Sequence, residues 1–286
     1  MIASANPPTP LAVNPVQQPG RSIKELTSTV SASRLSTWLQ CRLKFHLRYV
    51  AGVVKPPSAA LHVGKTVHAV LQQWSLARWR GSPLDAEAIG AVFEAAWTHP
   101  EGEAMVWNGE EEASAKGNAL AVIQTYLRDT PIPEDEKPEG VEVSVEIDLA
   151  SHGLPVLVGV LDLVRAGGRI VDFKTTGRTP DPKMVLHTTE VQTTGYALLY
   201  REATGQRETG IELHHLVKLK TPKIVVTEAG PATDHQVIRL FHVIDAYVDD
   251  LERRDPVPSP GMQCAACEFL GECNSALLKV FFAKPR

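Results

Sequence analysis

The sequence predicts an α/β protein in which a mixed central β-sheet is flanked by helices. Three consecutive segments between residues 141 and 175 alternate apolar and polar side chains with period two, as strands do. Helical spacing of apolar residues precedes and follows them. The 286 residues are 43% hydrophobic, which suffices for a sizeable core. We therefore expect an N-terminal arm, residues 1–22, followed by a single domain, residues 23–286.

Charge and hydropathy exclude two classes of protein. A net charge of -4 and a pI of about 6.2 argue against a polybasic nucleic-acid binder, but they leave open a nuclease whose metal-binding carboxylates are themselves acidic. No apolar run approaches the roughly 20 residues of a membrane helix. The N-terminus lacks a basic start followed by an unbroken apolar stretch. The expected location is cytoplasmic, with no membrane partner.

The N-terminal third is expected to be helical. Residues 1–22 carry five prolines with Asn, Gln and Gly, which predicts a disordered or draped arm. A helix is predicted within residues 26–50, with Ser31 or Ser33 as its cap. A second helix is predicted over residues 63–79 from its apolar spacing.

A helical insertion and linker are expected over residues 81–140, interrupted at 98–112 and ending in a proline-rich connection. The pattern then changes to period two, and glycine-containing turns join the first three strands into a meander. The strands are predicted over 141–149, 154–164, 169–175, 211–219 and 223–229, and the later helices over 188–205 and 232–254.

Three charged side chains interrupt the apolar strands. Residues i and i+2 of a strand share a face, so Asp172 and Lys174 point the same way. The tight turn before them brings Asp162 close to Asp172 on a neighbouring antiparallel strand. Two carboxylates repel unless a cation intervenes, and hard oxygen ligands select Mg²⁺ or Mn²⁺ rather than zinc. This composition is typical of a metal-dependent phosphodiesterase; the alternative is an ordinary ion pair between Asp172 and Lys174.

Four motifs occur in a fixed order along residues 64–200. They are "GKTVHAVLQ" with His68, "GVLD" with Asp162, "VDFKT" with Asp172 and Lys174, and "VQTTGYALLY" with Gln192 and Tyr196. Together they resemble the RecB-like branch of the PD-(D/E)XK nucleases, in which a helical His, an Asp, a D/E-x-K and a Q-x-x-x-Y recur in this order. The resemblance implies a restriction-endonuclease-like core.

The resemblance also implies roles for these residues. The implied metal ligands are His68, Asp162, Asp172 and the carbonyl of Phe173. Lys174 becomes the catalytic lysine, completing a catalytic set with His68 and the two aspartates. Gln192 and Tyr196, four apart and so on one helix face, are placed near the DNA or the active site.

Two further pairs of titratable residues have no clear role. Glu142 and Glu146 lie four apart on the strand before Asp162, and either could add a carboxylate to the site. A solvated strand face is the favoured interpretation for both. His214 and His215 point to opposite faces of a later strand, and neither is assigned a role.

The cysteines suggest a second metal site. Cys264, Cys267 and Cys273 form C-x2-C-x5-C, which places three thiols on one compact loop. Cys41 is the only other cysteine. An N-terminal Cys and a C-terminal triplet around a RecB-like core resemble the iron-sulphur nucleases, which include the AddB-type subunits and the fourth CRISPR-associated (Cas) family. The resemblance implies a structural 4Fe-4S cluster that joins residues 256–286 to Cys41 as a clasp; zinc or unrelated free cysteines are the alternatives.

The expected activity is that of a Mg²⁺- or Mn²⁺-dependent exodeoxyribonuclease that hydrolyses DNA with single strands or free ends. Repair, recombination and CRISPR spacer acquisition are the implied settings. No helicase signature G-x-x-x-x-G-K-[ST] occurs, which favours the small Cas-type nucleases over AddB. The alternatives are a non-catalytic protein that binds DNA ends for an integration complex and an RNA-processing nuclease. Protein partners in recombination or spacer integration, and a homo-oligomer, are left open.

Overall fold

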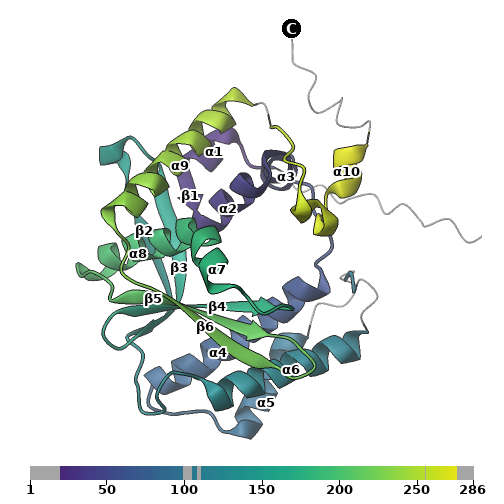
Figure 1. The fold of residues 1–286 in the computed structure, drawn as a ribbon, viewed down its shortest axis with the longest axis vertical. Coiled ribbons are helices and arrows are strands. Elements are labelled where there is room, and N and C mark those ends of the chain that lie inside the picture. Colours follow the sequence, from purple (N-terminus) through teal and green to yellow (C-terminus); the bar gives the residue numbers. More distant parts are fainter. Residues whose placement is uncertain (1–19, 99–104, 108–110, 255, 276–286) are drawn as a thin grey trace, which may run out of the picture.

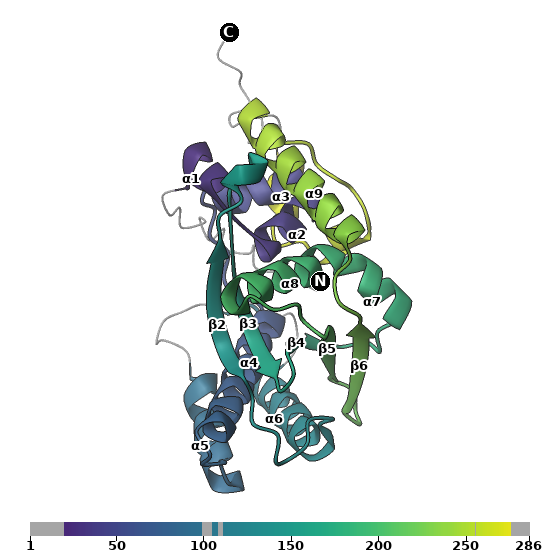
Figure 2. The same cartoon turned by 90° about the vertical axis from the view of Figure 1, so that its left-hand side faces the viewer.

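A computed structural model describes residues 20–98, 105–107, 111–254 and 256–275. Within these residues a six-stranded sheet lies between two layers of helices (Figure 1). The view turned by 90° shows the strands in the middle, α4, α5 and α6 on one side, and α2, α3 and α9 on the other (Figure 2). The molecule is thus an α/β protein, as the sequence predicts.

The sheet is mixed, with the strand order β1-β3-β4-β5-β6 and with β2 paired to β3. The strands are β1 (Thr29–Ser31), β2 (Gly140–Ile147), β3 (Val156–Arg165), β4 (Arg169–Thr176), β5 (Gly210–Val217) and β6 (Lys223–Ala229). The predicted meander is confirmed, because β2-β3 and β3-β4 pair antiparallel. The pairs β1-β3 and β4-β5 are parallel, and β5-β6 is antiparallel.

Two apolar cores separate the helical layers from the sheet. The helices are α1 (Ile23–Ser28), α2 (Ala32–Gln40), α3 (Arg42–Phe45), α4 (Ala59–Trp79), α5 (Ala86–Trp97), α6 (Glu112–Asp129), α7 (Pro182–Thr188), α8 (Glu190–Thr204), α9 (Asp234–Arg253) and α10 (Leu270–Asn274). The first core joins α1, α2, α8 and α9 to one sheet face. The second joins α4, α5 and α6 to the other face.

The prediction of one helix within residues 26–50 is wrong. Ser22 caps α1 in a capping box with Glu25, and the short strand β1 then leaves the helical path to pair with β3. Ser31, one of the two predicted caps, begins α2. Cys41 is extended, so it ends α2 and caps α3. A π-helical turn, His46–Val50, follows. Helical periodicity could not detect a three-residue strand whose partner lies more than 120 residues later.

The hairpin between β3 and β4 depends on two glycines. Gly167 and Gly168 have φ of +79° and +72°, in the left-handed region that side chains disfavour. A Cβ on Gly168 would also lie 2.4 Å from the Tyr200 hydroxyl. The turn chemistry read from the sequence therefore matches the observed hairpin, and this hairpin sets the distance between Asp162 and Asp172.

Parts of the expected domain division lie outside the described residues, namely positions 1–19 of the arm, most of the interruption at 98–112, and positions 276–286. Within the described chain, α5 and α6 occupy the region expected to be helical. Among all the described residues, no helix is both long enough and apolar enough to cross a membrane.

Candidate active site and cysteine site

The β3-β4 hairpin brings together the three charged side chains that interrupt the strands. Asp162 lies on β3, and its Oδ2 accepts a hydrogen bond of 3.0 Å from the backbone N–H of Phe173 on β4. On the same strand, Lys174 Nζ lies 2.7 Å from Asp172 Oδ2. The backbone therefore fixes one carboxylate, and a lysine balances the charge of the other.

His68 reaches this pair from α4. Its Nδ1 lies 3.5 Å from Asp162 Oδ2, and its Nε2 lies 2.9 Å from the carbonyl oxygen of Phe173. A carbonyl oxygen can only accept, so Nε2 donates, and in the neutral ring Nδ1 then presents a lone pair towards Asp162. A lone pair facing a carboxylate requires a proton or a metal ion between them. The arrangement also joins two predicted ligands, His68 and the Phe173 carbonyl, by a direct hydrogen bond.

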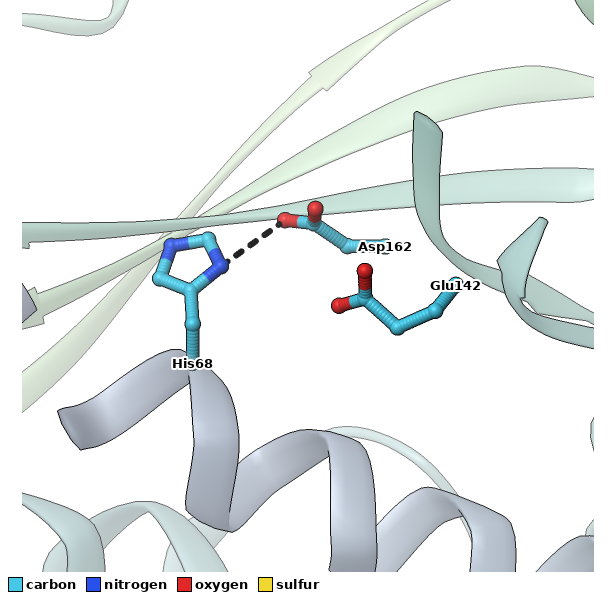
Figure 3. Close-up of side chains that lie close together, drawn as sticks. All are labelled: His68, Glu142 and Asp162. Atoms are coloured by element: carbon cyan, nitrogen blue, oxygen red, sulfur yellow. Dashed lines mark ion pairs between the residues drawn. The ribbon is translucent and has the colours of Figure 1, made fainter. Parts of the chain in front are cut away.

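Glu142 is a site residue for which the sequence interpretation left a carboxylate role open but favoured a solvated strand face. Among the described residues, one group of His, Cys, Asp or Glu brings three ligand atoms within 4.8 Å of one another, and it consists of His68, Glu142 and Asp162. Figure 3 shows these three side chains pointing toward a common point between α4 and the sheet. Glu142 is half-buried, so its expected place on a solvated strand face is wrong.

The reason is a local break in the ladder between β2 and β3. Val141 pairs with Leu163 and Val143 pairs with Leu161, but Glu142 has φ of +51° and no strand partner opposite it. On each strand, residues two apart then pack against different cores, Leu161 against one and Leu163 against the other. The side chains before and after Glu142 on β2, and before and after Asp162 on β3, therefore point to opposite faces of the sheet. Simple alternation along the sequence cannot predict where a strand exchanges its faces.

Burial and like charge shift the acidity of the site. Burial, followed by the charge of Asp172, raises the pKa of Asp162 to about 6, although His68 partly offsets both effects. Burial also raises the pKa of Glu142. Carboxylates that are destabilised as free anions in this way gain most from a bound cation.

Two side chains of α8, Gln192 and Tyr196, form hydrogen bonds with the ion pair of Asp172 and Lys174. Gln192 Oε1 accepts from Lys174 Nζ at 3.0 Å, and Gln192 Nε2 donates to Asp172 Oδ1 at 3.1 Å. The hydroxyl of Tyr196 donates to the same Oδ1 at 3.3 Å and accepts from Gln192 at 2.8 Å. Burial, then the charge of Asp172, raises the pKa of Tyr196, so the hydroxyl stays a donor. Both residues therefore orient the charged pair.

The other carboxylate oxygen of Asp172 has no hydrogen-bond donor among the described residues. Asp172 is 2% exposed, and its Oδ2 accepts no hydrogen bond. Lys174 lies within ion-pair distance of that oxygen, but its angle does not meet hydrogen-bonding geometry. A buried carboxylate oxygen of this kind is an expected position for a cation.

Two cavities meet at Asp162. One, of 530 Å³, lies beside α4 and is lined by His68, Glu142 and Lys65. The other, of 660 Å³, is lined by Gln192 and Tyr196 of α8. It also contains Ser31, Ser33, Ser144 and Glu146. A substrate can therefore approach Asp162 from both the α4 side and the α8 side.

A gap in the sheet explains how the second cavity reaches Asp162. Within the described ladders, β1 stops pairing with β3 at Val158, and β4 begins at Leu163. Between them, β3 has a neighbour only on the β2 side. At Gly159 a Cβ would lie 2.5 Å from Leu199 of α8, so the absence of a side chain lets this helix approach the gap.

The four cysteines surround a small apolar cavity of 40 Å³ at the opposite end of the molecule from α5. Cys41 Sγ accepts from the backbone N–H groups of Lys44 and Ser259, each at 3.5 Å. Cys264 Sγ accepts from Gly261 N–H, also at 3.5 Å. Burial and the other three cysteines raise the pKa of the Cys273 thiol. Sequence positions more than 220 residues apart thus meet in one thiol-lined site.

The chain was compared with known proteins. A family model described as the PD-(D/E)XK nuclease superfamily matches residues 29–274. No curated protein sequence matches the chain at a significant level. A crystal structure from Eubacterium rectale, described as that of a candidate exonuclease, superposes with a TM-score of 0.58 and 16% identity over 92% of this chain and 96% of that one. A second structure, SSO0001, gives a TM-score of 0.35 and 14% identity over 82% and 92%.

The structural similarity to the E. rectale protein concerns the fold alone, because the sequence identity is low. The family match covers most of the chain and includes β3, β4, α4 and α8, from which the charged site is built. The chain therefore belongs to the PD-(D/E)XK nuclease superfamily.

Proposed function

We propose that the protein is a nuclease that uses Mg²⁺ or Mn²⁺ to hydrolyse DNA phosphodiester bonds, and that it acts as an exonuclease on single strands. One observation carries the proposal. His68, Glu142 and Asp162 bring ligand atoms within 4.8 Å of one another, directly beside the ion pair of Asp172 and Lys174. A cation site next to a buried carboxylate and a lysine is the arrangement that phosphodiester hydrolysis requires.

The donor set fits a hard divalent ion. His68, Glu142, Asp162 and Asp172 offer one imidazole nitrogen and carboxylate oxygens, with no thiolate. Oxygen-rich sites of this type select Mg²⁺ or Mn²⁺. The buried Asp172 Oδ2, which accepts no hydrogen bond, supports its role as a further ligand. When bound, such an ion polarises the phosphate and lowers the pKa of a bound water.

The protein groups around the site would carry the remaining steps. Above its pKa of about 6, Asp162 is ionised and free to bind a cation. Lys174 is held by Asp172 and Gln192, so its ammonium group can orient a water and stabilise the negative charge that develops on the phosphate. Tyr196 stays protonated and keeps Asp172 in place through its hydrogen bond.

The same test distinguishes this function from two alternatives. A non-catalytic protein that only binds DNA ends would not need the complete set of carboxylates and lysine. An RNA-processing nuclease would share the metal chemistry but would read the 2′-hydroxyl. The preference for ends is supported by the description of the E. rectale protein as a candidate exonuclease. The settings of repair, recombination and CRISPR spacer acquisition are part of this proposal.

The test is a cleavage assay on DNA labelled at either end, as single strand and as duplex, with an RNA of the same sequence as competitor. Anaerobically purified protein should shorten the single-stranded DNA from an end in Mg²⁺ or Mn²⁺ and should be inactive in EDTA. Asp172→Ala and Lys174→Ala should abolish cleavage. Asp249→Asn, at an exposed position on α9, is the matched control and should retain activity. Full activity of either site variant in Mn²⁺ would refute the proposal.

We also propose that the four cysteines hold a 4Fe-4S cluster with a structural role. Backbone N–H groups point at two of the sulphurs, as they do at cluster thiolates. Four thiolates around a single zinc ion would lie about 3.8 Å apart, given a Zn–S distance of about 2.3 Å. Among the described residues no group of three cysteine sulphurs lies within 4.8 Å of one another, which is wider than the sulphur spacing of a formed tetrahedral zinc site.

A further inference from the structure

A separate cavity of 320 Å³ lies near the end of α2, among α1, α3 and the end of α9. It shares no lining residue with the two cavities at Asp162. Ala32 in the first turn of α2 lines the larger catalytic cavity, and Trp38 near the end of the helix lines this one, so about 9 Å of helix separates them. Its volume lies in the range of ligand pockets, about 300 to 1,000 Å³.

The charged lining of this cavity comes from separate segments. Arg21 precedes α1, Arg42 begins α3, and Arg254 follows α9. Among the described residues, the only acidic one in the lining is Asp250. Asp250 Oδ1 pairs with Arg42 at 3.2 Å, and its Oδ2 accepts a hydrogen bond of 2.7 Å from Trp38. Asp250 is therefore already neutralised.

The other two guanidinium groups are not balanced. Arg21 and Arg254 are exposed and have no ion pair with any residue of the described chain. Positions 1–19 and 276–286 contain no Asp or Glu, and Asp255, which lies outside the described residues, directly follows Arg254 in the sequence. Even with Asp255 counted, three arginines stand against two aspartates, so this group of residues carries an excess of one positive charge.

A buried arginine of α2, Arg34, interacts electrostatically with Arg21. Arg34 is 7% exposed and donates to the backbone oxygen of Thr29 at 2.7 Å and to its hydroxyl at 3.1 Å, but it pairs with no carboxylate among the described residues. Burial lowers the pKa of Arg34, and the positive charge of Arg21 lowers it further, so the two groups lie close enough to repel. An anion in the cavity would relieve this repulsion.

We propose that this cavity binds a phosphate group. Guanidinium groups match the geometry of phosphate oxygens, and Trp38 and Phe45 supply apolar walls next to them. We assign the phosphate to a nucleic-acid strand whose scissile bond lies at Asp162. That assignment rests on the proposed nuclease function, whereas phosphate binding itself does not.

The test measures binding in EDTA, where no cleavage occurs. The probes are a fluorescein-labelled single-stranded DNA, followed by anisotropy, and inorganic phosphate, followed by the Tm of the protein. The variant is Arg21→Ala with Arg254→Ala. The matched control is Arg253→Ala, an exposed neighbour whose ion pair within the described residues is with Asp249. The double variant should bind the DNA at least tenfold more weakly, and its salt slope should fall in magnitude by about 1.4, as expected for two lost phosphate contacts on a single strand.

Each outcome decides the proposal. Weaker DNA binding by the double variant, with the control unchanged, supports a strand phosphate. A phosphate-induced rise in Tm that the double variant loses, with DNA affinity unchanged, supports a site for free phosphate. If the double variant equals Arg253→Ala in both measurements, the site does not exist. Arg254→Glu serves as a second variant if the double variant is unstable. Loss of the proposed function would appear separately, as absent cleavage with this binding retained.

Discussion

Asp162 is contacted from three directions. A backbone N–H of β4 fixes its Oδ2, His68 approaches that oxygen from α4, and Glu142 approaches from β2. Burial and the charge of Asp172 hold the pKa of Asp162 at about 6, against about 3.9 in an unfolded chain. Between these two pH values the folded protein binds a proton that the unfolded chain has released. The ionised site is thus a source of instability in the metal-free protein.

This shift predicts a pH dependence of stability. Because the folded state binds more protons between about pH 4 and 6, the free energy of unfolding of the metal-free protein should fall as the pH rises through that window. Urea denaturation in EDTA at several pH values measures it. Asp162→Asn should remove part of this dependence. An equal slope in wild type and variant would show that another group is responsible.

Metal binding should show the opposite pH trend. A cation needs the ionised carboxylate, so affinity for Mn²⁺ should rise as the pH rises through about 6. Isothermal titration with Mn²⁺ at pH 5, 6 and 7.5 checks this, and the cleavage rate should follow the same curve. Affinity that stays constant over this range would contradict a site centred on Asp162.

Glu142 gives the sharpest prediction for a single residue. Glu142→Gln removes one carboxylate charge from the group that converges on the site, and it leaves the side-chain volume nearly unchanged. Mn²⁺ affinity and cleavage should fall at least as far as they do when a supporting ligand contact is lost, about 10- to 100-fold. The control is Glu228→Gln, which makes the same chemical change at an exposed position on β6. Wild-type metal affinity in Glu142→Gln would show that this carboxylate is not a ligand.

At the scale of the elements, α8 acts as a support for the charged pair. Gln192 and Tyr196 lie one turn apart on this helix, and their side-chain hydrogen bonds within the described chain go to Asp172, Lys174 and each other. The sequence suggested that they lie near the DNA or the active site. Their hydrogen bonds favour the second location and a role in orienting Lys174.

This role predicts a specific kinetic result. Gln192→Ala should lower kcat about tenfold or more, since a hydrogen bond to a charged group is worth about 1.5 to 3 kcal/mol, and it should leave KM nearly unchanged. The control is Glu202→Gln, an exposed position on the same helix. A rise in KM with unchanged kcat would instead place Gln192 on the substrate.

At the scale of the whole molecule, the two ends of the described chain meet at the cysteines. Lys44 and Arg48 pair with Glu268, and Lys55 pairs with Glu272, so ion pairs surround the thiol site. Phe269 packs in the same apolar cluster. A cluster bound there would link the segment after β1 to the segment after α9 and would stabilise both.

Removal of one thiol should therefore disturb the whole protein. Cys41→Ala should abolish the broad visible absorption and iron content of anaerobically purified protein, and it should lower Tm and solubility. Elemental analysis separates iron from zinc, since a colourless protein with stoichiometric zinc would contradict the cluster. If the variant keeps its metal content and its solubility, the four-ligand site is wrong.

Several features were predictable because they depend on neighbours in sequence. Period-two alternation located β2, β3 and β4, and paired glycines located the turn between β3 and β4. That turn alone brings Asp162 to Asp172. The ordered motifs then suggested the superfamily, which the match over residues 29–274 shows.

Other features depend on partners that are distant in sequence, so local patterns could not reveal them. The strand β1 exists because Thr29–Ser31 pairs with β3, although the surrounding residues have helical spacing. Glu142 joins the site because the ladder breaks opposite Asp162, and alternation assumes an unbroken ladder. The basic cavity exists because Arg21, Arg42 and Arg254 meet after folding.

The sequence by itself determined the fold class, the β3-β4 hairpin and the chemical types at the site, since each follows from local periodicity, turn residues or motif order. Only the tertiary structure decided which carboxylate joins His68 and Asp162, what Gln192 and Tyr196 contact, and where unbalanced positive charge collects. The physical reason is that ligand geometry and electrostatic balance depend on distances in space. Those distances are set by packing between elements far apart along the chain.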